Sequence, residues 1–378
     1  MKRYLSLLLC VCLLFCAIPL RARAGSAPLS VSSPSAILTS GDGKVLFEKN
    51  AHEKRPIASV TKVMTLLLVF EALEAGELTL SEVVAASEHA CSMGGSQIWL
   101  SEKDRLTAEE MIKAVVICSA NDCAVALAER LAGTEEAFVS RMNARAAELS
   151  MADTHFENAC GLPAEGHVSS AYDVAVMSRE LIKHEKIKEY TVIWQDTLRG
   201  GEFTMTNTNK LIRTFRGMTG LKTGYTSDAG YCLAATAERD GLSLCAVALG
   251  AESADGRNGD VAAMLEYGFA SYISVDPTPD APLTPVKVKL GESGYAILRL
   301  GEHEPLTLEK AKAKGTVKTV KTAESVTAPV EEGQTVGELE ISLDGETLAV
   351  IPIVTAHAVS RLGLLGILKK IMRVSCMK

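Results

Sequence analysis

Three short polar strings, far apart along the chain, constrain the fold more than any other feature. They are Ser59-Val60-Thr61-Lys62, Ser119-Ala120-Asn121 and Lys222-Thr223-Gly224. The second and third patterns occur once each, whereas Ser375-Cys376-Met377-Lys378 repeats the first pattern by chance. A serine hydroxyl is a weak nucleophile that needs a neighbouring base, such as a lysine that has lost its proton. A fold that uses all three strings must therefore bring them to one crevice.

The segment around the first string predicts a hairpin followed by a helix. Two apolar runs, residues 35–38 and 45–47, are separated by Gly41-Asp42-Gly43, which is typical of a β-hairpin. Pro56 ends this extended chain, and residues 60–75 form a strongly apolar helical pattern with Ser59 at its first turn. Lys62 lies three residues further on, on the same helical face, so the two side chains can meet.

The rest of the first 275 residues predicts a helical insertion and then more strands. Helical patterns cover residues 108–118, 122–132, 135–149 and 171–183, and the second string falls on the turn between the first two. After Lys222, residues 229–237 and 242–249 predict a second hairpin, and residues 260–272 predict a closing helix. Both ends of this region would then build one antiparallel sheet, with the helices inserted between them.

Residues from about 30 to 273 resemble the low-molecular-weight penicillin-binding proteins that act as D-alanyl-D-alanine carboxypeptidases. In that family alanine or glycine is ordinary at the middle of the second string, so Ala120 favours it over class A β-lactamases. Further matching features are Gly95-Ser96, Asn158-Ala159-Cys160-Gly161-Leu162, Gly166-His167 followed by Ser169 and Asp173, and Ala229-Gly230-Tyr231. The resemblance implies the α+β penicillin-binding/β-lactamase-like transpeptidase fold, in which helices flank an antiparallel sheet beside an all-helical region.

The residues of the strings suit acyl transfer through a serine ester. Ser59 is the candidate nucleophile, and Lys62 is the candidate base if burial and the nearby charge of Lys222 lower its pKa. A tetrahedral oxyanion needs two fixed donors, and the resemblance assigns them to the backbone N–H groups of Ser59 and Tyr225. Ser119 can relay a proton to the departing amine.

The remaining residues of the strings suit the binding of a peptide that ends in D-Ala-D-Ala. Asn121 can hold the lysine base and contact the substrate amide. Lys222 and Thr223 suit the terminal carboxylate, and Gly224 lets the substrate backbone lie against the strand. We therefore expect a carboxypeptidase that removes the terminal D-alanine from peptidoglycan stem pentapeptides, with β-lactams as covalent inhibitors.

Competing functions have less support in the sequence. No G-x-S-x-G and no H-E-x-x-H is present, so an α/β-hydrolase and a zinc peptidase have no candidate residues, and we expect no metal or cofactor. His167 is interpreted as structural support. A β-lactamase remains an alternative, although the E-x-x-L-N segment of class A enzymes is absent. A catalytically silent penicillin-binding wall module is the other alternative.

The beginning of the chain predicts export. Lys2 and Arg3 precede an apolar run over residues 5–20, and Ala22-Arg23-Ala24 offers a cleavage site, so residues 1–24 are interpreted as a signal peptide. Cleavage of this segment removes four basic residues and no acidic one, so the formal charge changes from −7 to −11. Such an acidic protein is not expected to bind nucleic acid. We expect a bacterial enzyme at the outer face of the cytoplasmic membrane or in the cell-wall space.

The cysteines do not define a disulfide framework. Three of the ten lie in residues 1–24, and the odd number that remains leaves at least one unpaired. No C-x-x-C pair is present, and the spacings match no zinc site. Most of these cysteines are expected to be small buried hydrophobes, although Cys118 and Cys123 flank the second string.

Two further segments follow the predicted catalytic domain, residues 25–275. Short alternating runs within residues 281–355 predict a small all-β domain, which resembles the C-terminal domain of these carboxypeptidases. That domain is either a spacer or an independent binding module. Residues 359–378 predict an amphipathic helix, because Leu364, Leu368, Ile371 and Met372 share one side and Lys369, Lys370 and Arg373 the other. Peripheral membrane contact is expected, with packing on the β domain as the alternative.

Overall fold

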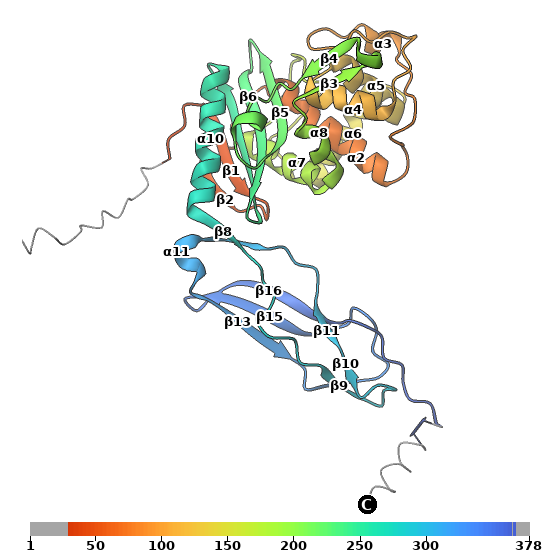
Figure 1. Ribbon diagram of the computed structural model, residues 1–378, viewed down its shortest axis with the longest axis vertical. Helices are drawn as coiled ribbons and strands as arrows, with labels where there is room; N and C mark the ends of the chain where they lie inside the picture. Colours follow the sequence, from red (N-terminus) through yellow and green to blue (C-terminus); the bar gives the residue numbers. More distant parts are fainter. Residues whose placement is uncertain (1–28, 365, 368–378) are drawn as a thin grey trace, which may run out of the picture. The chain divides into compact units, whose positions relative to one another are not determined.

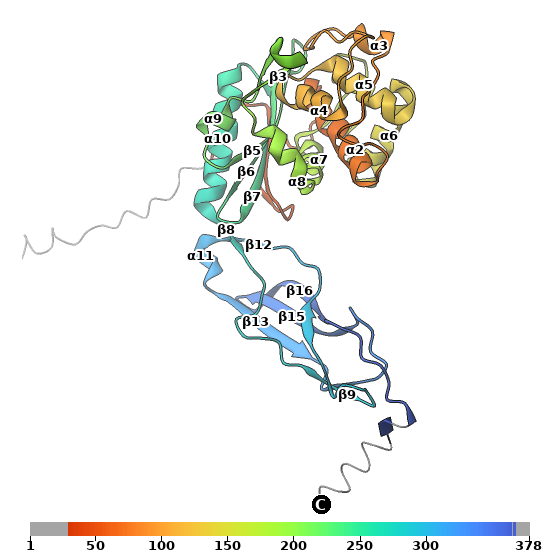
Figure 2. The ribbon, with the colours of Figure 1, turned by 45° about the vertical axis from the view of Figure 1, so that its right-hand side comes forward.

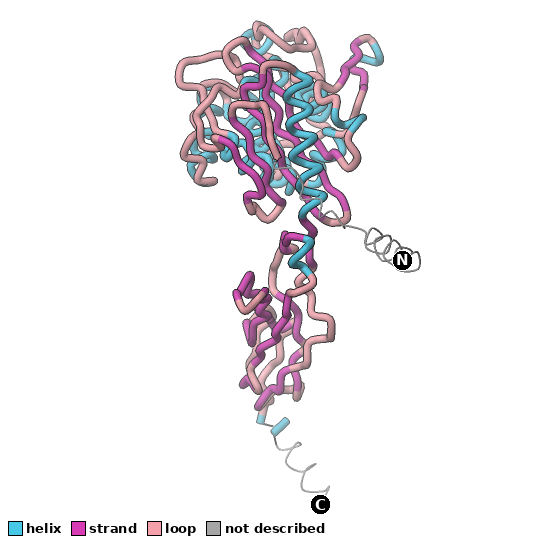
Figure 3. The backbone as a smooth tube through the Cα atoms, turned by 90° about the vertical axis from the view of Figure 1, so that its left-hand side faces the viewer, coloured by secondary structure: helices cyan, strands magenta, loops and turns pink. Residues whose placement is uncertain are grey.

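The computed structural model describes residues 29–364, 366 and 367. The predicted signal peptide, residues 1–24, and most of the predicted tail helix lie outside these residues. Within the described part, a mixed region of helices and strands is followed by a region of strands and connecting loops with one short helix (Figure 3).

A five-stranded antiparallel sheet forms the centre of the first region (Figure 1). Its strand order is β2-β1-β7-β6-β5, where the strands are β1 (Ser35–Ser40), β2 (Val45–Lys49), β5 (Met218–Thr226), β6 (Gly230–Arg239) and β7 (Leu242–Ala251). The early strand β1 pairs with the late strand β7, with Ile37 opposite Val247. This pairing confirms that both ends of the region build the sheet, and it places β5 at one edge.

Helices cover both faces of this sheet (Figures 1 and 2). On one face α10 (Ala254–Ser271) packs closely, because Gly268 leaves room for Leu38 and Leu244. On the other face lie α7 (Ala171–Lys183) and the rest of the insertion, which contains α2 (Lys62–Glu74), α3 (Glu88–Cys91), α4 (Ala108–Ile117), α5 (Asn121–Ala132), α6 (Glu135–Glu148) and α8 (Glu185–Thr191). The shared core includes Ile37, Phe70, Phe138 and Val247, all buried.

Three details of this region differ from the sequence prediction. The helix expected from residue 60 begins as a 3₁₀ helix, η1 (Ala58–Thr61), before α2 starts at Lys62. Helix α10 begins six residues before the expected residue 260, since Ser253 caps it by accepting the Gly256 N–H. The hairpin of β3 (Gln195–Leu198) and β4 (Phe203–Thr206) and the one-turn α9 (Leu211–Thr214) were not expected.

The second region contains two small sheets and the predicted strands. One sheet has the order β11-β16-β15-β13 and the other β10-β9-β14, while β8 pairs with β12. The elements are β8 (Tyr272–Val275), β9 (Val286–Lys289), β10 (Tyr295–Ala296), β11 (Leu298–Leu300), β12 (Leu306–Glu309), α11 (Lys310–Ala313), β13 (Thr316–Thr322), β14 (Ser325–Thr327), β15 (Thr335–Leu343) and β16 (Glu346–Thr355). Leu339, Ile341 and Ile353 are buried in its own core, which confirms a small β domain.

The predicted tail helix does not begin at residue 359. Val359 forms a β-bridge with Val330, and Arg361 forms one with Gly291, so this stretch is extended. Burial of Val359 against Val288 and Val330 explains why the chain stays paired to the β domain there. Leu364 is the first residue in helical conformation, and most of the remaining tail lies outside the described residues. No helix in the described part of the chain is both long and apolar enough to cross a membrane.

Candidate active site

Ser59 lies in the tight turn that starts the first long helix. It is the second residue of η1, directly after Ala58, whose φ of +47° is unusual for a residue with a side chain. A loop presses against this turn at Gly161, which has a φ of +85°. A Cβ at Gly161 would lie 1.9 Å from the carbonyl oxygen of Ala58, so only glycine allows this contact. The loop at Gly161 thus fixes one side of the turn that carries Ser59, the candidate nucleophile.

Lys62 is fully buried and its Nζ contacts three oxygen atoms. They are Oγ of Ser59 at 2.9 Å, Oδ1 of Asn121 at 2.6 Å and the carbonyl oxygen of Cys160 at 2.7 Å. A neutral amine has two N–H donors and one lone pair. In that form Nζ can donate to Asn121 and Cys160 and accept the hydroxyl proton of Ser59, which is the geometry of a general base.

Burial lowers the pKa of Lys62 to about 8. The nearby Cys160 and the buried carboxylate of Asp122 partly offset this effect by raising the pKa. The charge of Lys222, which the sequence analysis expected to lower this pKa, is not among the causes. Burial first, and the charge of Lys62 second, hold the pKa of Lys222 well below its usual value.

The second string lies beside Lys62, which Asn121 contacts. Ser119 has a φ of +65°, and its Oγ is buried without a hydrogen-bond partner among the described residues. Asn121 is the first residue of α5 rather than part of the turn. Its amide donates to the carbonyl oxygen of Gly94 at 2.6 Å, and its backbone N–H donates to that of Ser96 at 2.7 Å. Asn121 therefore connects Lys62 to the loop that carries Gly95-Ser96.

The third string lies on the edge strand β5, next to Ser59. A Cβ at Gly224 would come within 3.0 Å of the backbone nitrogens of Ser59 and Val60, so the strand and η1 are in direct contact. Lys222 and Thr223 are both buried, and Oγ1 of Thr223 donates to Oγ1 of Thr208 at 2.7 Å. Tyr225 follows on the strand, where it is exposed and its ring packs against that of Tyr231 in a tilted arrangement.

Several supporting residues hold this arrangement. Asn158 accepts the backbone N–H groups of Cys160, Gly161 and Leu162 on its Oδ1, which shapes the loop against η1. Nε2 of His167 lies 2.7 Å from Oγ1 of Thr61, and Nδ1 accepts a hydrogen bond from the N–H of Glu157. Burial lowers the pKa of His167 to about 4. A neutral imidazole with these contacts supports the helix start, as expected for a structural histidine.

Sequence reasoning missed two residues of the site. Asp122 accepts the N–H groups of Ile98 and Leu100 on one oxygen, at 3.0 Å each, and so fixes the loop beside Asn121. Its position directly after the second string was a usable signal. Thr208, which contacts Thr223, comes from the loop before α9 and had no signal, because lone threonines are common.

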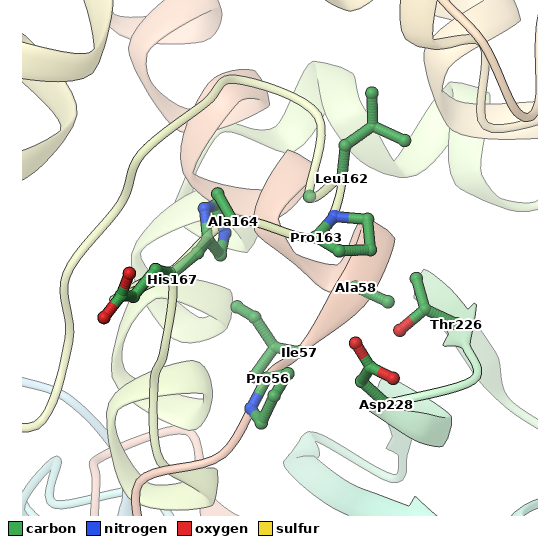
Figure 4. Close-up of a pocket in the computed structure, with 11 residues that line it drawn as sticks. Pro56, Ile57, Ala58, Leu162, Pro163, Ala164, His167, Thr226 and Asp228 are labelled. Atoms are coloured by element: carbon green, nitrogen blue, oxygen red, sulfur yellow. The ribbon is translucent and has the colours of Figure 1, made fainter.

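A cavity of about 360 Å³ adjoins the nucleophile turn (Figure 4). Its walls include Ile57, Ala58 and Leu162, and Thr226 and Asp228 lie on the side formed by the end of β5. The described residues contain no group of three or more His, Cys, Asp or Glu side chains that could hold a metal ion. The arrangement therefore offers a serine, a buried amine and a strand edge for chemistry on an acyl substrate.

Two family profiles match the chain. One, described as D-alanyl-D-alanine carboxypeptidase, matches residues 22–253. The other, described as the C-terminal domain of penicillin-binding protein 5, matches residues 278–361.

Curated relatives match over nearly the whole chain. D-alanyl-D-alanine carboxypeptidase DacF of Bacillus subtilis is 40% identical over 354 residues, which cover 92% of this chain and 91% of the relative. D-alanyl-D-alanine carboxypeptidase DacC of Escherichia coli is 31% identical over 356 residues, with coverage of 90% and 89%.

Solved structures show the same fold. Penicillin binding protein 5 from Haemophilus influenzae has a TM-score of 0.74 and 25% identity, and the match covers 89% of this chain and 100% of that one. Penicillin-Binding Protein D2 from Listeria monocytogenes, solved in its ampicillin-bound form, has a TM-score of 0.59 and 34% identity, with coverage of 64% and 100%.

Proposed function

Because the chain belongs to the family of D-alanyl-D-alanine carboxypeptidases, we propose that Ser59 removes the terminal D-alanine from peptidoglycan stem pentapeptides through an acyl-enzyme. The family match and the named relatives make it a serine carboxypeptidase of the cell wall. The residue roles are our assignments. The observation that carries them is the contact between Ser59 Oγ and the buried Nζ of Lys62.

Acylation begins when neutral Lys62 takes the hydroxyl proton of Ser59. Oγ then bonds to the carbonyl carbon of the penultimate D-alanine, and the N–H groups of Ser59 and Tyr225 stabilise the resulting oxyanion. Lys222 and Thr223 bind the terminal carboxylate. When the C–N bond breaks, Ser119 passes its hydroxyl proton to the departing amine and receives the proton that Lys62 took from Ser59, so D-alanine leaves and Lys62 is neutral again. The buried, unpartnered hydroxyl of Ser119 supports this relay.

Deacylation returns the enzyme to its starting state. Lys62, neutral again after giving up its proton, takes one proton from a water molecule as that water attacks the ester carbonyl. The ester bond breaks, Ser59 regains its proton, and the shortened stem peptide dissociates. Asn121 keeps Nζ of Lys62 in position during both steps through the 2.6 Å contact.

β-Lactams are proposed to acylate the same serine. The ampicillin-bound structure of the relative from Listeria monocytogenes supports this proposal, as does the direct contact between η1 and β5 around Gly224. The strained lactam carbonyl takes the place of the scissile amide, and its carboxylate takes the place of the terminal one at Thr223.

One experiment tests the proposal and separates it from the alternatives. Purified protein is incubated with a pentapeptide ending in D-Ala-D-Ala, and free D-alanine is measured for the wild type and for Ser59→Ala. We expect release by the wild type and none by the variant. Rapid hydrolysis of a cephalosporin without D-alanine release would establish a β-lactamase instead. Labelling by a fluorescent penicillin without either turnover would establish a silent wall module.

The remaining proposals concern the organisation and location of the chain. We assign residues 25–275 to the catalytic domain, residues 281–355 and the paired stretch up to Arg361 to the small β domain, and the residues after Arg361 to a membrane-associating tail. Residues 1–24 are proposed to be a signal peptide that exports the enzyme to the outer face of the cytoplasmic membrane. The wall function of the relatives supports an extracytoplasmic location.

A further inference from the structure

Two of the oxygen atoms that hold the amine of Lys62 belong to separate parts of the chain. One is the carbonyl oxygen of Cys160, and the other is Oδ1 of Asn121. The Asn121 amide donates in turn to the carbonyl oxygen of Gly94. The position of Nζ therefore depends on how the two loops that carry Cys160 and Gly94 are placed relative to each other.

Glu135 connects the segments on which these loops depend. It is the first residue of α6, and its side chain is only 11% exposed. Oε1 accepts the N–H of Ala159 at 2.8 Å, directly before Cys160 in the chain. Oε2 lies 2.7 Å from Nε2 of His89, in the one-turn helix α3 that leads into the loop of Gly94. A single carboxylate thus joins α3 to the start of the other loop.

Further hydrogen bonds carry this contact toward Lys62 on both sides. The Ala159 carbonyl oxygen accepts the hydroxyl of Thr65, so this residue is held from α6 and from α2 at once. On the other side, both the N–H and the hydroxyl of Ser92 donate to the His89 carbonyl oxygen, at 3.0 and 2.7 Å. A displacement at the carboxylate should therefore reach the oxygen atoms around Nζ.

We propose that the pair of Glu135 and His89 positions Lys62, because it places the two loops that hold Nζ and so sets the rate of acylation. This inference rests on the role of Lys62 as the base in the proposed function. Both residues act through others and are positioning residues. A reacting group that is misplaced by about 1 Å can lose up to a hundredfold in rate, so a contact behind the loops can matter to the chemistry.

The charge of His89 should modulate this effect. The charged groups that face it are Glu135 and Glu136 of α6 and Glu129 of α5. The hydrogen bond to Glu135 is the main cause that raises the pKa of His89 above its ordinary value of 6.5, and burial partly offsets it. Below the raised pKa an imidazolium forms an ion pair with the carboxylate, and above it only a neutral hydrogen bond remains. The contribution of the pair is therefore largest at acidic pH.

The test measures the second-order rate constant for acylation by a fluorescent penicillin. At pH 7 we expect Glu135→Ala to lower it by about tenfold. Glu135→Gln keeps an acceptor for the Ala159 N–H and should stay within about threefold of the wild type. The ratio of wild type to His89→Gln cancels the common titration of Lys62. This ratio should fall from about threefold at pH 6 toward one as His89 loses its proton.

Two matched variants test whether any acid or any histidine–glutamate pair has this effect. Glu136 is the exposed neighbour of Glu135 at the same helix start. His184 contacts Glu74 at 2.6 Å, at the opposite end of α2 from Lys62. Glu136→Ala and His184→Gln should be acylated like the wild type at every pH, and Tm measurements confirm that each variant folds.

The outcomes separate this inference from the proposed function. A wild-type rate in Glu135→Ala, a loss that Glu135→Gln does not restore, or a His89→Gln ratio that is independent of pH would overturn the positioning role alone. A wild-type protein that is not labelled by penicillin and releases no D-alanine would instead refute the proposed function.

Discussion

Lys62 can remove a proton from Ser59 only in its neutral form, so acylation should rise with pH. Burial lowers the pKa of this lysine to about 8. Below that pH the neutral fraction falls tenfold per unit, to about one hundredth at pH 6. We expect the second-order rate constant for acylation by a fluorescent penicillin to rise between pH 6 and 8 and to level off above.

The control for this pH dependence is Lys62→Arg. A guanidinium stays protonated at every accessible pH, so this variant should show no acylation between pH 6 and 10. A wild-type rate that is flat from pH 6 to 9 would contradict the role of Lys62 as the base.

Gly161 should be intolerant of even one added methyl group. A Cβ there would lie 1.9 Å from the Ala58 carbonyl oxygen, and backbone atoms cannot move aside easily. Left-handed strain and overpacking together should cost about 3 kcal/mol or more in the free energy of unfolding. The displaced turn should also slow penicillin acylation at Ser59 by at least about tenfold. Urea unfolding and labelling kinetics measure the two effects.

Gly133 provides the matched control for that substitution. Its φ of +86° is almost the same as the +85° of Gly161, but nothing lies within 4 Å of an added Cβ. Gly133→Ala should therefore show only the strain of a sparsely populated backbone conformation (ψ −38°), about 1–3 kcal/mol, with unchanged acylation. Similar losses of acylation in both variants would mean that contact with Ala58 does not position the nucleophile.

At the scale of elements, local patterns predicted most helices and strands but not their irregular ends. The apolar periodicity located the hairpin of β1 and β2 and the helices α4 to α7. It did not predict η1, because its left-handed Ala58 depends on the distant loop at Gly161. Helix α10 begins before the predicted residue 260 because Ser253 caps it, and the prediction missed these first turns because they contain Gly256 and Gly259, which lower helix propensity.

Asp122 links helix α5 to the loop beside the active site, so its removal should loosen that element. One carboxylate oxygen accepts both Ile98 and Leu100 N–H groups at the helix start. Asp122→Asn should reduce the free energy of unfolding by about 1–3 kcal/mol, because hydrogen bonds to a charged group are lost or weakened. It should also move the rise in acylation to lower pH, since the carboxylate raises the pKa of Lys62.

Asp255→Asn is the control for a helix-start acid. Asp255 is also the second residue of its helix, α10, but it is exposed. Loss of its interaction with the helix dipole should reduce the free energy of unfolding by only about 0.3–1 kcal/mol. Hydrogen exchange of residues 98–100 that stays as slow in Asp122→Asn as in the wild type would refute the link.

At the scale of the whole molecule, the sequence indicated which strings meet but not what completes the site. The order and chemistry of the three strings were sufficient to predict that Ser59, Asn121 and Lys222 converge. The Cys160 carbonyl oxygen, which contacts Lys62, could not be predicted, because a backbone oxygen leaves no signature in the sequence.

Catalysis and membrane contact should be separable in this chain. From residue 356 onward the sequence contains five basic residues and no acidic one. Each basic residue near an anionic surface contributes about 1 kcal/mol. Replacing Lys369, Lys370 and Arg373 together with glutamine should therefore weaken binding to anionic vesicles about a hundredfold. Release of D-alanine from a soluble pentapeptide should stay unchanged, because the residues that we propose for catalysis all lie between Ser59 and Tyr225.

A matched triple variant distinguishes the tail from the overall charge. Lys287, Lys289 and Lys314 are exposed in the β domain, and replacing them with glutamine changes the net charge by the same amount. This control should sediment with anionic vesicles like the wild type, and neither protein should sediment well with neutral vesicles. If both triple variants lost binding equally, the β domain would share the contact. If neither lost it, the tail would not be a membrane anchor, and its basic residues would have to act elsewhere.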